Sequence, residues 1–236
     1  MPCAAGLVLM AGAALACGPR AREPIETVQD GRTALAPAPG DRGGVLVRVV
    51  NALPDGRVDI VAGDSVLFSA VGPREVTDFK EITEQSVSFT LRRSGQDSAV
   101  VTNRELMMGG SHYTLVAVPT MDGGIALRAL QDETAAADRT KIRVINAVTG
   151  SDDLKVVVQG RQDPLFSDLD VGEVGGWSEV DPATSTLLTI QSPEGATVAR
   201  VDRMELEAGR AYTVVLTGTR GNVQTFRFGD RVVSER

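Results

Sequence analysis

The sequence predicts an all-β protein whose folded part consists of two tandem antiparallel β-sandwiches. Three observations predict it: short segments alternate apolar and polar residues, turn-forming residues separate them, and the whole pattern occurs twice. Glycine (25) and proline (11) are frequent, and no long segment has helical periodicity. Each half of the pattern therefore predicts about seven short strands.

The first 16 residues are predicted to be a signal peptide. Leu7–Ala16 is apolar and uncharged, and it is shorter than the roughly 20 residues that a membrane-spanning helix needs. Ala14-Leu15-Ala16 before Cys17 resembles the lipobox of bacterial lipoproteins, although that motif prefers Leu where Ala14 stands. The resemblance implies an acylated Cys17 that anchors the chain in a membrane. Ordinary cleavage before Cys17, which yields a soluble secreted or periplasmic protein, is the alternative.

Residues 17–43 are predicted to be a flexible tether. Pro, Ala and Gly dominate this stretch, and large apolar residues are too few for a core. Gly18 follows the cysteine where many lipoproteins of the inner membrane have Asp. By the same resemblance, the chain is expected to be exported to the cell envelope, on the outer membrane facing the periplasm or the surface.

Charge and cysteine usage exclude several functions. The chain has 24 Lys and Arg against 31 Asp and Glu, with a net charge of −7, and no basic cluster suited to nucleic acid. Its two cysteines, Cys3 and Cys17, both precede the predicted fold. A disulfide framework, a cysteine-ligated metal and a cysteine nucleophile are therefore excluded from residues 44–236.

An internal repeat defines the modules. Val47–Ala52 recurs as Ile142–Ala147 at an offset of 95, and Gly110–Val116 recurs as Gly209–Val215 at an offset of 99. The small drift suits a duplicated domain with loops of different length. The predicted first module spans residues 44–132, the linker spans 133–140 with a helical turn, and the second module spans 141–236.

Within each module, residues at alternate positions are predicted to face the core, with one buried face for each sheet. The expected inward residues are Val45, Val47 and Val49; Val58 and Ile60; Val87, Phe89 and Leu91; Tyr113, Leu115 and Ala117; and, in the second module, Ile142 and Val144; Leu154, Val156 and Val158; Thr186, Leu188 and Ile190; Tyr212, Val214 and Leu216. Turns are expected at Leu53–Gly56, Met121–Gly124 and Thr219–Asn222, the last two as hairpins in which Gly supplies positive φ.

The repeated segments resemble the bacterial family called domain of unknown function 4397 (DUF4397), over residues 44–132 and 141–233. The resemblance is carried by Val47–Ala52, Pro54 and Val58–Ile60, by Phe68 to Phe79 and Phe166 to Trp177, and by Gly209–Val215. The second module lacks the early proline. The resemblance implies an exported, often lipid-anchored protein with an Ig-like sandwich, and the family has no assigned active site.

Few residues suggest chemistry. His112 is the only histidine, and no Gly-x-Ser-x-Gly motif accompanies it, so we interpret it as an exposed residue at the start of a strand. The acidic stretches containing Asp152, Asp153, Asp168 and Asp170 offer oxygens for Ca²⁺, but they lack EF-hand spacing and are better explained as solvated turns.

Three pairs of residues recur between the modules. Arg48 and Arg143 point away from the apolar face of their strands, which favours a structural ion pair or an exposed residue over a ligand contact. Asn51 and Asn146 are expected to cap turns. Phe79 and Trp177 are expected to pack over the sandwich cores, with sugar stacking as the alternative.

The sequence thus predicts a non-enzymatic cell-envelope lipoprotein that serves as a structural or interaction module. Its expected partners are the membrane, through the lipid anchor, and envelope proteins or glycans; no cofactor and no nucleic acid are expected. A carbohydrate- or Ca²⁺-binding surface module is the alternative, and a hydrolase that uses His112 is the third hypothesis.

Overall fold

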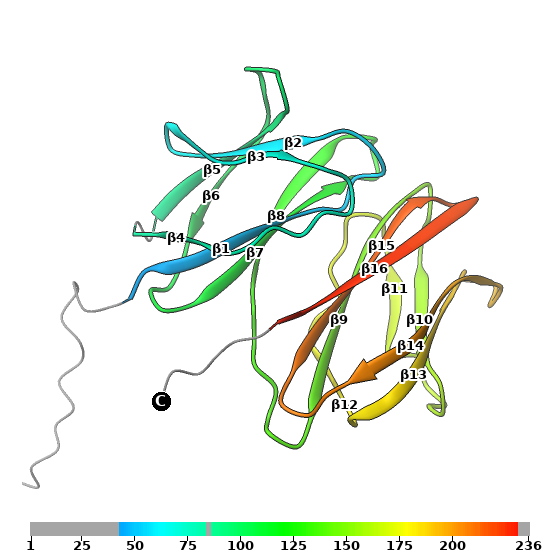
Figure 1. Ribbon diagram of the computed structural model, residues 1–236. Coiled ribbons are helices and arrows are strands. Elements are labelled where there is room, and N and C mark those ends of the chain that lie inside the picture. The colour runs from blue at the N-terminus through cyan, green and yellow to red at the C-terminus, as the bar shows by residue number, and fades with distance from the viewer. Residues whose placement is uncertain (1–42, 84–85, 231–236) are drawn as a thin grey trace, which may run out of the picture. The chain divides into compact units, whose positions relative to one another are not determined.

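The computed structural model describes residues 43–83 and 86–230 (Figure 1). The predicted signal peptide, Cys17 and all but the last residue of the predicted tether lie outside the described residues. The described ranges contain sixteen strands and no helix, so the expected all-β tandem sandwich is confirmed. Residues 43–83 and 86–230 contain no helix that is long and apolar enough to cross a bilayer.

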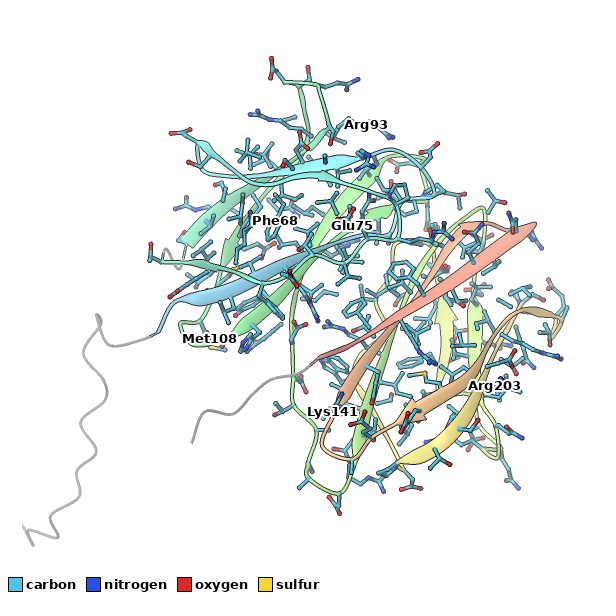
Figure 2. The ribbon with its side chains drawn as sticks, in the orientation of Figure 1. Phe68, Glu75, Arg93, Met108, Lys141 and Arg203 are labelled. Atoms are coloured by element: carbon cyan, nitrogen blue, oxygen red, sulfur yellow. The ribbon has the colours of Figure 1, made fainter. Side chains whose placement is uncertain are left out.

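The first module contains eight strands in two facing sheets, ordered β4-β1-β7-β8 and β3-β2-β5-β6. The strands are β1 (Val45–Asn51), β2 (Val58–Ala62), β3 (Ser65–Val71), β4 (Lys80–Ile82), β5 (Ser86–Arg93), β6 (Ala99–Leu106), β7 (His112–Pro119) and β8 (Ile125–Gln131). Figure 2 shows Phe68 of β3 between these sheets, where its side chain is buried, and Met108 at the surface.

The second module repeats the same topology, with sheets β12-β9-β15-β16 and β11-β10-β13-β14. Its strands are β9 (Thr140–Thr149), β10 (Leu154–Val158), β11 (Phe166–Leu169), β12 (Ser178–Val180), β13 (Ala183–Gln191), β14 (Thr197–Leu206), β15 (Ala211–Thr219) and β16 (Asn222–Asp230). Between β8 and β9 the chain makes one hydrogen-bonded turn, from Arg139 N to Ala136 O at 3.0 Å, rather than a helix.

One strand pair in each module departs from the expected antiparallel pairing. β1 runs parallel to β7, with Arg48 opposite Thr114, and β9 runs parallel to β15, with Arg143 opposite Thr213. A parallel pair needs a long crossover, which the intervening strands supply by passing through the other sheet. The sequence repeat does not reveal this pairing, because side chains alternate with a period of two residues in both parallel and antiparallel strands.

Each module has its own core, formed by the side chains that alternation predicts. Val47, Ile60, Phe89 and Leu115 belong to one cluster, and Ile142, Val156, Leu188 and Val214 belong to the other. Each tyrosine hydroxyl accepts a hydrogen bond from a backbone N–H five residues upstream, Tyr113 from Met108 at 3.0 Å and Tyr212 from Glu207 at 3.2 Å. Buried tyrosines commonly place their hydroxyls in this way at the corners of sandwiches.

The expectation of one buried face for each sheet is wrong for β1, β7, β9 and β15. The outward side chains of these strands, together with Ala52 directly after β1, form a third buried cluster that draws on both modules: Val50, Ala52, Val116 and Val118 with Ile145, Ala147 and Val215. Val50 and Val116 occupy the repeat positions of Ile145 and Val215, so corresponding faces of the two modules pack together. Strands buried on both faces have nearly continuous apolar runs, which is the pattern of β7 and β15.

The predicted hairpins connect β7 to β8 and β15 to β16. In the second hairpin, Gly218 adopts positive φ (101°) instead of Gly221. A Cβ at Gly218 would lie 2.3 Å from the carbonyl oxygen of Asn222, so the turn is too close for any side chain there.

Candidate functional site

The most concentrated group of polar side chains lies between the modules, around Asp132. This aspartate directly follows β8, and its side chain is completely buried. Arg48 Nη2 lies 3.3 Å from Asp132 Oδ2, and Arg48 Nε donates to Thr114 Oγ1 at 2.9 Å. The Thr114 hydroxyl donates in turn to the same carboxylate at 2.8 Å. The parallel register of β1 and β7 places Arg48 and Thr114 opposite each other and so brings this group together.

Arg143 of the second module contacts the other oxygen of the same carboxylate. Its Nη2 donates to Asp132 Oδ1 at 2.6 Å, and its Nε donates to Thr213 Oγ1 at 2.8 Å. The Nη1 group donates to the backbone oxygen of Gln131 at 3.2 Å. The prediction of a structural ion pair is confirmed for both arginines, and a single aspartate joins them across the two modules.

Aromatic rings cover the two guanidinium groups. Arg48 lies 4.6 Å from the ring centroid of Phe79 and 4.5 Å from that of Phe228, and Arg143 lies 4.3 Å from that of Trp177. The expectation that Phe79 and Trp177 pack over the sandwich cores is therefore wrong. Both rings are half-buried and belong to neither core cluster, because the face of each ring attracts a cation on the outer side of the sheet.

The environment of the arginines is structural rather than reactive. Burial lowers the pKa of Arg48 to about 10, an effect that Asp132 opposes and that Arg143 reinforces. Burial also lowers the pKa of Arg143, again opposed by Asp132. The side chains of Arg48 and Arg143 expose only 6% and 3% of their surface, so both guanidinium groups are held inside the protein beside Asp132.

Asn51 is the last residue of β1 and Asn146 lies within β9, and the two side chains make equivalent bonds. Each side-chain oxygen accepts from the backbone N–H two residues on, at 3.1 Å and 3.0 Å. Each side-chain nitrogen donates to the carbonyl at the end of β3 or β11, Val71 or Leu169, at 2.9 Å and 2.8 Å. The predicted capping role is confirmed, and both side chains are fully buried.

His112 is the first residue of β7 and is half-buried rather than exposed. Its ring packs edge-on against Phe79, with the centroids 5.2 Å apart. No hydrogen bond joins the ring to a carboxylate or hydroxyl of the described residues. Its backbone oxygen accepts from Asp132 N at 2.9 Å, which helps to place the aspartate.

The four acidic candidates lie on loops of the second module. Asp152 and Asp153 line a pocket beside β10, while Asp168 and Asp170 flank Leu169 near the end of β11. Asp168 has φ of 56°, and Ala70, its counterpart in the repeat, has φ of 53°, so the position serves a bulge that recurs without the carboxylate. Within the described ranges, no three His, Cys, Asp or Glu side chains converge as a metal site. Calcium binding stays a prediction.

Sequence reasoning missed Asp132, the residue that connects the arginines. One signal was available in the repeat. Asp132 bonds to the backbone of His112 at the start of β7, and Asp230 pairs with Ala211 at the start of β15. An aspartate therefore recurs at the equivalent position of the second module. The position falls at the boundary between module and linker, where an acidic residue looks like part of a solvated connection.

Solved structures that overlay on the chain have low similarity to it. A family 26 carbohydrate-binding module of Eubacterium rectale, solved with maltoheptaose, is 12% identical, with a TM-score of 0.26 over 79% of this chain and 98% of that one. A candidate cell adhesion protein of Bacteroides uniformis is 11% identical, with a TM-score of 0.29 over 80% and 97%. One from Bacteroides fragilis is 12% identical, with a TM-score of 0.23 over 83% and 99%. At these TM-scores the overlays carry no functional information.

No curated protein matches the chain. The profile of the family described as domain of unknown function (DUF4397) matches twice, at residues 45–157 and 140–234, and together the matches span both sandwiches. The chain therefore belongs to the DUF4397 family and carries two copies of its domain.

Proposed function

We propose that the protein is a non-enzymatic, lipid-anchored component of the cell envelope that acts as a two-module structural or interaction unit. The observation that carries the proposal is the bridge from Asp132 to Arg48 and Arg143, with the apolar cluster around it. The polar residues that recur in the repeat stabilise this junction and the segments around Asn51 and Asn146. Loops and the outer faces of the other two sheets are left to contact partners.

The proposed anchor is an acylated Cys17, which places the protein on the outer membrane with its modules in the periplasm or at the surface. Cys17 is the only cysteine after the apolar leader. Acyl chains on one cysteine bury enough methylene groups for stable attachment. The partners are envelope proteins or glycans.

Fractionation of cells that express Cys17→Ser tests the anchor, with Cys3→Ser as the matched control. The wild type and Cys3→Ser should sediment with membranes, and mass spectrometry should find an acylated Cys17 at the N-terminus. Cys17→Ser should lose the acyl mass and become soluble. An unmodified cysteine in membrane-bound wild-type protein would refute lipid anchoring.

The non-enzymatic assignment is tested with His112→Ala in a panel of ester, peptide and glycoside substrates. Wild type and variant should both equal the uncatalysed rate. Turnover by the wild type that His112→Ala abolishes would instead support the hydrolase hypothesis. Titration calorimetry with cell-wall glycans and with Ca²⁺ tests the alternative of a carbohydrate- or calcium-binding module. The absence of binding heat with both would refute that alternative.

A further inference from the structure

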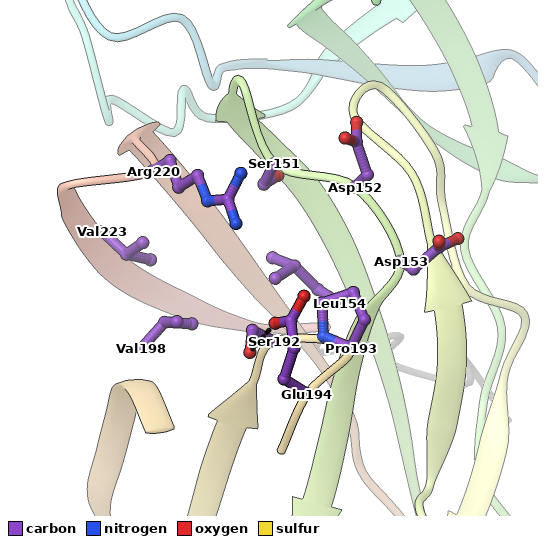
Figure 3. A pocket seen from close by; sticks show the side chains of 10 residues that line it. All are labelled: Ser151, Asp152, Asp153, Leu154, Ser192, Pro193, Glu194, Val198, Arg220 and Val223. Carbon is purple, nitrogen blue, oxygen red and sulfur yellow. Dashed lines mark hydrogen bonds between the residues drawn. The ribbon is translucent and has the colours of Figure 1, made fainter. Parts of the chain in front are cut away.

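A pocket of about 310 Å³ opens between three loops at one end of the second module (Figure 3). The loops connect β9 to β10, β13 to β14, and β15 to β16. Leu154, Val198 and Val223 form the apolar part of its lining. Leu154 belongs to the core cluster of the module, and the other two pack against it. The floor is thus held in place by the core.

The charged part of the lining has both signs. Arg220 and Glu194 point from two different loops toward the space above Leu154 (Figure 3). The pKa of Glu194 lies below its ordinary value, chiefly because the Ser192 hydroxyl donates to it at 2.6 Å and also because Arg220 and Lys155 are nearby cations. Glu194 is therefore ionised at neutral pH.

Arg220 and Glu194 do not touch each other. The positive charge of Arg220 is near enough to lower the pKa of Glu194, but the two side chains form no ion pair. The guanidinium group forms no hydrogen bond within the described residues. Asp152 also lines the pocket, but its carboxylate points away from Leu154 and Glu194 (Figure 3). The Arg220 guanidinium and the Glu194 carboxylate thus border one apolar floor, and a ligand with a charge of each sign would pair with both of them.

The arrangement is particular to the second module. The first module has Met121 at the position of Arg220. Pro119 pairs with Ile125 in the first hairpin, and Gly218 pairs with Val223 at the same point of the second. Met121 and Arg220 each lie two residues after these equivalent positions. A charge needed by the fold itself would recur in both copies, as Arg48 and Arg143 do. The topology that the two copies share therefore does not require Arg220.

We propose that this pocket binds a small zwitterion, an amino acid or dipeptide with an aliphatic side chain. The ligand carboxylate pairs with Arg220, its ammonium group pairs with Glu194, and its side chain covers Leu154, Val198 and Val223. The volume of about 310 Å³ corresponds to about ten water molecules at roughly 30 Å³ each, which suits a dipeptide. None of the described residues that line the pocket is aromatic, so the stacking surface favoured by sugars is missing. The proposal goes beyond the function proposed above and does not depend on the anchor.

Titration of the ¹⁵N-labelled protein with the dipeptide Ala-Leu, followed by NMR, tests the proposal. Amide signals of Leu154, Ser192, Glu194 and Arg220 should shift with saturation at millimolar peptide or below. N-acetyl-Ala-Leu and Ala-Leu amide each lack one charge, and each should bind at least about tenfold more weakly. Maltose and CaCl₂ are the competing probes. Shifts of these amides by either probe and not by the dipeptide would overturn the proposal, as would no shift with any probe.

Variants separate the two charges. In Arg220→Gln, Ala-Leu and its amide should bind equally, because the partner of the carboxylate is gone. In Glu194→Gln, Ala-Leu and N-acetyl-Ala-Leu should bind with equal affinity, because the partner of the ammonium group is gone. Arg200→Gln, an exposed arginine on β14, is the matched control and should bind as the wild type does. Unchanged selectivity in Arg220→Gln, or an equal loss in Arg200→Gln, contradicts the assignment. Either result would leave the fractionation experiment on Cys17 unaffected.

Discussion

Asp132, at the end of the first module, accepts a hydrogen bond of 2.6 Å from Arg143, in the first strand of the second. The same carboxylate lies 3.3 Å from Arg48 of its own module. This one buried side chain therefore links the two copies of the repeat electrostatically, beside an apolar cluster that links them by packing.

Asp132→Ala should destabilise the protein by about 3–5 kcal/mol, because it leaves buried guanidinium groups without this partner. Urea unfolding monitored by circular dichroism measures the change as a lower midpoint. Asp138→Ala is the control: this aspartate is exposed in the same connection, and its loss should change stability by less than about 0.5 kcal/mol. Equal midpoints for Asp132→Ala and the wild type would contradict the structural role of the bridge.

Because the modules share a buried face, the wild type should unfold in a single calorimetric transition. Val118 is completely buried in the shared cluster, so Val118→Asp places a carboxylate where water cannot reach it. The expected result is a lower melting temperature with the transition split in two, as the modules lose their mutual support. Val66→Asp, at a position that is 58% exposed, should melt as the wild type does. Two separate transitions in the wild type itself would show that the modules unfold independently.

Gly172 is required by contact as well as by backbone conformation. It has φ of 80°, and a Cβ there would lie 2.5 Å from the carbonyl oxygen of Pro119 in the first module. Gly160 has φ of 86° and no atom within 4 Å of its hypothetical Cβ. Both Gly→Ala changes incur a backbone cost of about 1–2 kcal/mol.

Gly172→Ala should cost at least about 1 kcal/mol more than Gly160→Ala, because a backbone oxygen has little room to yield. Chemical denaturation of the two variants side by side measures the difference. Identical stabilities would mean that the modules can separate slightly at this point without loss.

Ser192→Ala should raise the pKa of Glu194, because the hydroxyl that favours the carboxylate is removed. Ser192→Thr keeps the hydroxyl and should keep the pKa low. Carbon-detected NMR titration of the side-chain carboxyl measures both.

The sign of the pH effect follows from the same shift. Since the pKa of Glu194 is lower in the folded state, ionised Glu194 stabilises the fold above the ordinary value of 4.5, and this contribution is lost as pH falls through the folded pKa. Ser192→Ala should therefore narrow the stability difference between neutral and acidic solution. A pKa that is the same with and without the hydroxyl would refute this account.

Local patterning predicted most of the fold. Alternation placed Phe89, Leu115, Leu188 and Val214 in the cores, and the repeat predicted two copies of one topology. These inferences succeed because the side-chain period of a strand is fixed at two, whatever the strand pairs with.

The sequence did not predict which strands pair when they lie far apart in the chain. The parallel alignment of β1 with β7 puts Arg48 opposite Thr114, and nothing in either segment indicates the partner or its direction. Phe79 and Trp177 illustrate the same limit, since their spacing in the repeat fits core packing and arginine stacking equally well.

The sequence by itself determined the strands, their inward faces, the duplication and the structural character of Arg48, Arg143, Asn51 and Asn146, because neighbouring residues set those properties. Only the tertiary structure decided that the outer face of one sheet in each module is also buried, that Asp132 serves arginines of both modules, and that Arg220 and Glu194 border one pocket. Those relationships depend on which distant surfaces meet, and complementarity between surfaces is a property of the folded chain as a whole.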